Sequence, residues 1–171
     1  MGLIHYNPAS FKRNLNINDW YLPSKDEMSA MAFALNMSTG LYWTSSEIDQ
    51  NNANFQKVGF IQEGVFNKNS SYYVRPIRDF EAEEVTPVGE LGGGGIIFYI
   101  FEMEGAYKHY IAAPSNAPIT LAWGASGVIT GATGTAIGTG KANTALIVAA
   151  LEAIPETGKA AQYCNDLIVT E

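Results

Sequence analysis

The densest group of potential metal ligands in the sequence consists of oxygen-bearing side chains just after a predicted strand. They are Glu47, Asp49, Asn51 and Asn52. Carboxylate and amide oxygens at such close spacing are the ligands that calcium prefers. The spacing differs from that of an EF-hand loop, because Asn54 stands where the glycine of such a loop would be. Asp and Asn side chains also bond the backbone of their own turn, so we favour an Asx-rich turn over calcium and expect no cofactor.

Aromatic side chains form a second group that could bind a ligand. Tyr42 and Trp43 are adjacent in one predicted strand, and Tyr72 and Tyr73 in another. Because strand side chains alternate, one ring of each pair should face the core and the other the surface. An outward ring surrounded by amides suits a sugar or a protein surface, although cross-strand packing of the rings is an equally good explanation. The predicted ligand-binding residues are therefore Trp43, Glu47, Asp49, Asn51, Asn52, Asn54, Gln56 and Tyr73.

No residue pattern indicates catalysis. His5 and His109 are isolated, and Cys164 lies in an apolar helical pattern typical of a buried thiol. The Gly-rich segment 131–141 fails as a phosphate-binding loop, because the first glycine is replaced by Thr135 and the final Ser or Thr by alanine. We therefore predict a protein that is not an enzyme, with no catalytic residue and no metal site.

The composition limits the possible partners. The chain of 171 residues has 47% hydrophobic and 16% charged residues, which indicates a globular fold. Its formal charge is −7 and its ten Lys and Arg do not cluster, so we expect no nucleic-acid partner. No apolar run is long enough to span a bilayer, and the first residues lack the pattern of a signal peptide.

The first half of the sequence predicts one helix and several short strands. Ser24 stands three residues before Glu27, which is the spacing of a capping box and predicts a helix over 25–35. Pro76 cannot donate to a strand ladder, so the strand that contains it should lie at a sheet edge or turn its missing donor outward. Arg75 and Arg78 flank Pro76; we expect them to pair with Glu47 or with the acidic residues of the linker at 81–91, and at least one of them to have a structural role. The predicted strands are 41–46, 55–61, 64–66 and 72–80, with a hairpin turn at 62–64.

The second half follows an acidic linker at 81–91. An unbroken apolar run at 96–101 predicts a buried strand, which pairs with 107–113. A loop over 114–140 is followed by a helix capped by Asn143 or Thr144, and a last helix starts near residue 157. The fold class is therefore α+β, with short antiparallel strands and about three helices.

Three stretches of the first half resemble one known family. They are Asp19–Glu27, Gly40–Glu47 and Tyr72–Arg78, and they resemble the major paralogous domain family, which also supplies the C-terminal domain of the Legionella collagen-like adhesin. The second half, with Gly93–Tyr99 and Ala160–Leu167, is similar to the first half of the long members of that family. The resemblance implies a C-type-lectin-like fold, related in shape to the sulfatase-modifying-factor domain.

The two halves occur in the reverse of the family order. This implies a circularly permuted domain, in which residues 1–80 form the C-terminal half of the family unit, 81–91 the linker and 92–171 the N-terminal half. Two alternatives stay open: half-domains completed by swapping with a neighbouring chain, which would give oligomers, and a fragment of a tandem array.

The resemblance implies a non-enzymatic recognition or structural module that presents a loop-rich face to carbohydrate or protein. Together with the composition, it favours a phage virion component, such as a tail, fibre or head-decoration protein, located in the virion or on an extracellular surface. A fragment of a bacterial cell-surface adhesin or lipoprotein is the alternative. An enzyme of the sulfatase-modifying-factor type is less favoured, because that chemistry needs cysteines or a metal that the single Cys164 does not supply.

Overall fold

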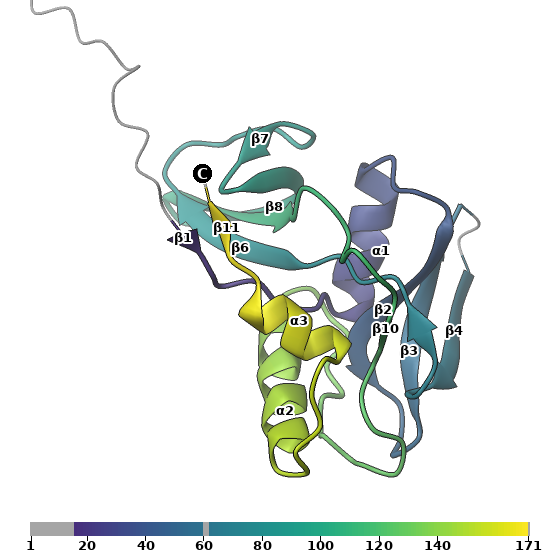
Figure 1. The fold of residues 1–171 in the computed structure, drawn as a ribbon. Helices are drawn as coiled ribbons and strands as arrows, with labels where there is room; N and C mark the ends of the chain where they lie inside the picture. The colour runs from purple at the N-terminus through teal and green to yellow at the C-terminus, as the bar shows by residue number, and fades with distance from the viewer. Residues whose placement is uncertain (1–15, 60–61, 171) are drawn as a thin grey trace, which may run out of the picture.

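The computed structural model describes residues 16–59 and 62–170, and this part of the chain has a mixed α+β fold (Figure 1). The predicted α+β class, with short antiparallel strands, is confirmed. The helices of the described residues are α1 (Lys25–Ala34), α2 (Gly140–Glu152) and α3 (Ala160–Asp166).

The strands form two main antiparallel sheets and two short ladders. One sheet has the order β2 (Gly40–Glu47), β3 (Asn52–Val58) and β4 (Gln62–Asn67). The other has the order β6 (Ile77–Ala82), β9 (Ala106–Ala112), β8 (Gly95–Met103) and β7 (Leu91–Gly92). The ladders are β1 (Asn16–Ile17) with β11 (Val169–Thr170), and β5 (Ser71–Tyr72) with β10 (Leu121–Ala122). Helix α1 contacts strands of both main sheets, while α2 and α3 pack against each other at the lower end of the molecule in Figure 1.

Helix α1 begins with the predicted capping box. The backbone N–H of Ser24 donates to Glu27 Oε2 at 2.7 Å, and the N–H of Glu27 donates to Ser24 Oγ at 3.4 Å. Glu27 is fully buried and its other carboxylate oxygen accepts from the N–H of Gly138 at 2.8 Å. The capping residue therefore also fixes the loop that precedes α2.

Both hydrophobic cores combine residues from the two sides of the acidic segment. The first core joins Leu22, Trp43 and Phe55 to Trp123 and Ile147, among others. The second core consists of Tyr21, Met28, Met31, Tyr42, Val58 and Ile77 from the first side, and Phe98, Tyr110 and Ala112 from the second. Residues 16–80 and 92–170 thus bury a shared interior.

The two ends of the described chain lie side by side, because β1 pairs antiparallel with β11 (Figure 1). The acidic segment begins inside the sheet, since Glu81 and Ala82 are the last residues of β6. It re-enters the sheet at Leu91, the first residue of β7. The segment that connects β6 to β7, residues 83–90, is therefore shorter than the predicted linker at 81–91.

The predicted hairpin turn at 62–64 is wrong, because these residues belong to β4. Gly64 lies opposite Phe55 in the β3–β4 ladder, and a Cβ at this position would collide with the Phe55 ring. The glycine is therefore required for ring packing, which a sequence pattern cannot distinguish from a turn signal.

The predicted cap of the second helix is also wrong. Helix α2 begins at Gly140, so Asn143 and Thr144 lie inside it and are buried. Their side chains cross-link the two halves instead: Asn143 Nδ2 donates to Ser45 Oγ at 3.1 Å, and Thr144 Oγ1 accepts from the N–H of Leu22 at 3.0 Å.

Two expectations about strands had different outcomes. The predicted single strand over 72–80 is wrong, because Pro76 lies outside the strands, between β5 and β6; β6 itself lies at the edge of its sheet. The apolar run at 96–101 is buried only in part, because Ile97 and Phe98 are buried whereas Phe101 is 54% exposed. The outer end of β8 extends beyond the core, so hydrophobicity alone overestimates its burial.

Candidate functional site

The predicted binding residues are distributed over several places in the structure. Trp43 is fully buried, and its Nε1 donates to the carbonyl of Leu121 at 3.0 Å. Tyr42 is fully buried as well, so the prediction that one ring of this pair faces the surface is wrong. The reason is that β2 lies between the two cores, with Trp43 in the first core and Tyr42 in the second. Trp43 cannot contact a ligand without unfolding.

The second aromatic pair alternates as predicted. Tyr73 is 41% exposed, while Tyr72 packs against the first core. The rings also make the cross-strand contacts that were the alternative explanation, with centroids 4.8 Å apart for Trp43 and Tyr72 and 5.3 Å apart for Tyr42 and Tyr73. The Tyr73 ring thus packs against Tyr42 and is partly exposed to solvent.

Glu47 forms a buried ion pair. Lys68 Nζ lies 2.5 Å from Glu47 Oε1, and both side chains are almost fully buried. Lys68 also donates to the carbonyl of Val128 at 2.7 Å, and the N–H groups of Thr130 and Gly131 donate to the Glu47 carboxylate. Burial would raise the pKa of Glu47, but the bonds from Lys68, Thr130 and Gly131 lower it overall. The pair and its hydrogen bonds link β2 to a loop of the second half. No sequence signal indicated that Glu47 is buried, because it lies in a polar stretch.

Asp49 organises the turn between β2 and β3. Its carboxylate accepts from the backbone N–H groups of Asn51 at 2.7 Å and Asn52 at 2.8 Å, and from Asn52 Nδ2. The hydrogen bond from the Asn52 side chain is the main cause that lowers the pKa of Asp49. This is the Asx-rich turn that we favoured over calcium. Within 16–59 and 62–170, no three His, Cys, Asp or Glu side chains are grouped so as to hold a metal ion.

The remaining predicted amides are mostly engaged within the fold. Asn51 Oδ1 accepts from Ser126 Oγ at 2.9 Å, and the buried Asn54 donates to the carbonyl of Ser46 at 3.2 Å. Gln56 is also buried, and its Oε1 accepts from Ser29 Oγ at 3.1 Å. Gln56 differs from the others because it lines a pocket.

The pocket lies between α1 and β3 and has a volume of about 410 Å³. This is within the range of roughly 300–1,000 Å³ that is usual for small-ligand sites. We call it the α1–β3 pocket; its lining residues are Ser29, Ala32, Phe33, Gln56, Lys57, Val58 and Gly59. Phe33 is 90% exposed, so a whole aromatic ring borders an opening that also presents a hydroxyl and an amide. The sequence pattern identified Gln56 but not Phe33, because a phenylalanine in a helix is normally buried and gives no signal of exposure.

The two arginines beside Pro76 have different partners from those we expected. Arg78 pairs with Asp19, with Nε 2.6 Å from Oδ1 and Nη2 3.0 Å from Oδ2. Arg75 bonds neutral acceptors, the side chain of Asn116 and the carbonyl of Pro114. Neither arginine pairs with Glu47, whose partner is Lys68.

The residues considered for catalysis serve the fold. His109 is fully buried, and its Nε2 accepts from the N–H of Thr86 at 3.0 Å. Cys164 is fully buried, and burial raises the pKa of its thiol. Such a thiol is a poor nucleophile. His5 lies outside the described residues.

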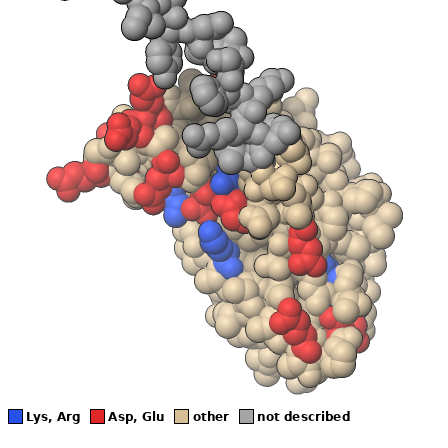
Figure 2. Space-filling view, turned by 60° about the vertical axis from the view of Figure 1, so that its left-hand side comes forward, with Lys and Arg blue, Asp and Glu red and all other residues tan. Residues whose placement is uncertain are grey.

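Figure 2 shows a face on which acidic side chains lie beside a few Lys and Arg at the upper left, with further acidic side chains at the lower right and uncharged surface between them. Over residues 16–59 and 62–170, no helix is both long enough and apolar enough to cross a membrane. Comparison of the chain with models of protein families, with curated proteins and with solved structures gives no match in any of the three.

Proposed function

We propose that the chain is a non-enzymatic recognition module that binds carbohydrate, or a protein surface, at the α1–β3 pocket. One observation carries this proposal: the Phe33 ring is 90% exposed at the border of the pocket. An apolar ring in contact with water is stabilised when it covers another apolar face, such as the C–H face of a sugar ring. The Ser29 hydroxyl donates to the buried Gln56 amide and has acceptor lone pairs left for a sugar hydroxyl.

The buried state of Cys164 and His109 supports a binding role over the sulfatase-modifying-factor type of enzyme. Such an enzyme needs an accessible cysteine or a bound metal at its site. Cys164 is instead part of the first core, and His109 binds the backbone of Thr86. The polar groups around the α1–β3 pocket are suited to orienting a ligand.

The C-type-lectin-like identity and the permuted order of the halves are part of the same proposal. The pairing of β1 with β11 supports permutation, because the new ends of a permuted domain lie where the parent chain was continuous and are therefore close together. The shared cores support a self-contained domain over swapped half-domains and over a fragment of a tandem array. A place in a phage virion is proposed from composition and resemblance, and a bacterial adhesin or lipoprotein is the second candidate.

A glycan array with the purified chain tests the binding function. We expect binding of neutral glycans, with affinity lowered about tenfold or more in Phe33→Ala, which corresponds to about 1.4 kcal/mol. Ile129→Ala is a matched control, because Ile129 is 71% exposed but does not line the pocket.

Two results would count against this function. One is glycan binding that Phe33→Ala and Ile129→Ala affect equally. The other is metal-dependent turnover of a substrate, measured together with mass spectrometry of the bound metal. An array without any binder would direct the search to protein partners at the same pocket.

A further inference from the structure

Arg75 is a partly buried cation without a carboxylate partner. Within the described part of the chain, five other cations lie within 4 Å of an acidic side chain, namely Lys25, Lys68, Arg78, Lys108 and Lys159. Arg75 donates only to neutral oxygens, from Nη1 to Asn116 Oδ1 at 3.2 Å and from Nη2 to the Pro114 carbonyl at 3.3 Å. Its Nε–H is buried without an acceptor, and burial lowers its pKa. Because a guanidinium keeps its charge at neutral pH, this charge is partly dehydrated and uncompensated.

Arg75 and Tyr73 project from the same face of an extended segment. Val74, which lies between them, and Pro76, which follows Arg75, are both buried. Because side chains alternate along an extended segment, Tyr73 and Arg75 point outward. Pro76 restricts Arg75 to an extended backbone, which keeps the two side chains roughly 6.6 Å apart at their origins. This spacing is comparable to the width of one sugar ring.

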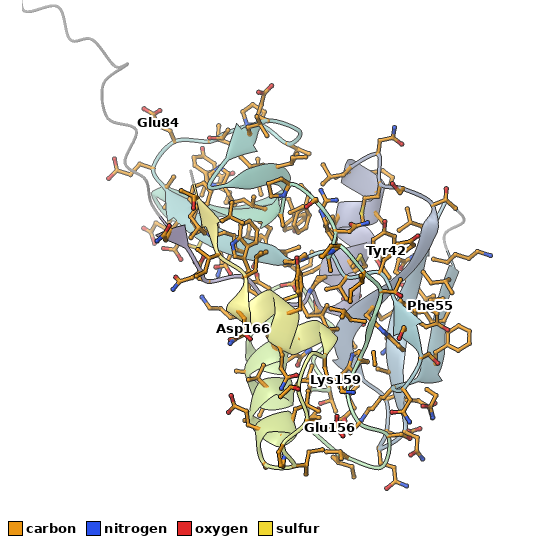
Figure 3. The ribbon with its side chains drawn as sticks, in the orientation of Figure 1. Tyr42, Phe55, Glu84, Glu156, Lys159 and Asp166 are labelled. Atoms are coloured by element: carbon orange, nitrogen blue, oxygen red, sulfur yellow. The ribbon has the colours of Figure 1, made fainter. Side chains whose placement is uncertain are left out.

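The neighbouring residues fix both side chains. The Tyr73 ring lies against Gly40, where a Cβ would come within 2.7 Å of Tyr73 Cε2. Asn116, which accepts from Arg75, donates from Nδ2 to the hydroxyl of Tyr42 at 3.1 Å, and the Tyr42 ring contacts Tyr73. Tyr42 is labelled in Figure 3, beside α1. We call this connected set, Tyr42, Tyr73, Arg75 and Asn116, the Tyr73–Arg75 face.

We propose that the Tyr73–Arg75 face binds a sugar that carries one carboxylate, of the uronic-acid type. The carboxylate pairs with the outer edge of the Arg75 guanidinium, and the exposed side of the Tyr73 ring covers the apolar face of the sugar. A single carboxylate matches the single cation, whereas a polyanion would need several and would be repelled by the net charge of −7. This inference rests on the proposed recognition function but concerns a different surface from the α1–β3 pocket.

Titration of the full chain with a glucuronate disaccharide, followed by NMR, tests this inference. We expect binding of the acid to be at least tenfold tighter than binding of its uncharged methyl ester. Arg75→Gln should remove most of this preference and Arg75→Lys should retain part of it, whereas Tyr73→Ala should weaken the binding of acid and ester alike. Lys141→Gln is the control, because Lys141 is an exposed cation outside the face. Backbone amide spectra check that each variant is folded.

Several outcomes would overturn the inference: equal affinity for acid and ester, a preference that Arg75→Gln leaves unchanged, or equally tight binding of a sulfated disaccharide without a carboxylate or of an acidic peptide. Binding of neutral glycans that depends on Phe33 can be measured on the same samples. If that binding is present and the uronate preference is absent, the inference fails while the proposed function stands.

Discussion

Lys68 and Arg75 are two cations on neighbouring segments of the chain, and their surroundings differ in kind. Lys68 is fully buried, bonds a carboxylate and a carbonyl, and lies over the Trp123 ring with Nζ 4.8 Å from the centroid. Arg75 is partly exposed and bonds two neutral acceptors, the side chain of Asn116 and the carbonyl of Pro114. Neither member of a buried ion pair can be removed alone without leaving an uncompensated charge, whereas a charge without an opposite partner is free to attract one from outside.

The largest predicted effect comes from removing Lys68, the cation of the buried ion pair. Lys68→Met leaves the Glu47 carboxylate buried without its cation, so we expect the free energy of unfolding to fall by about 3–5 kcal/mol. The double variant Lys68→Met with Glu47→Leu should recover a large part of this loss, since no isolated charge is left. Urea denaturation measures both.

Arg75→Gln provides the contrast in the same assay. Because Arg75 has no ion pair to lose, we expect a change in the free energy of unfolding below about 1 kcal/mol. Equal losses for Lys68→Met and Arg75→Gln would mean that the two cations have the same structural role.

The two buried glutamates predict opposite dependences of stability on pH. The pKa of Glu47 is lowered overall, so its contribution to stability is present above the unfolded pKa of about 4.3 and is lost as the pH falls through the folded value. Burial raises the pKa of Glu27 against the bonds from Ser24 and Gly138, so its contribution is present below about pH 4.3 and is lost as the pH rises through the folded value.

Unfolding free energies measured between pH 3 and pH 8 check these signs. Relative to wild type, Glu27→Gln should gain stability as the pH rises, and the double variant at Lys68 and Glu47 should lose the dependence at the acidic end. The same pH profile for wild type and both variants would contradict the assignment.

The sequence predicted the elements whose signals are local. The capping box at Ser24 and Glu27 correctly indicated where α1 begins, because both partners lie within one turn. The Asx turn at Asp49 was predictable for the same reason. Burial of Glu47 and Lys68 was not, since their pairing joins distant segments and polar residues are normally exposed. The exposure of Phe33 and the lack of an acid near Arg75 likewise depend on tertiary packing.

The central claim is that residues 16–80 and 92–170 form one domain around a shared interior. Differential scanning calorimetry of the purified chain, with its mass in solution measured in parallel, tests it most directly. We expect a monomer that unfolds in a single transition whose calorimetric and van't Hoff enthalpies agree. Two separate transitions, or a single transition that requires an oligomer, would contradict it.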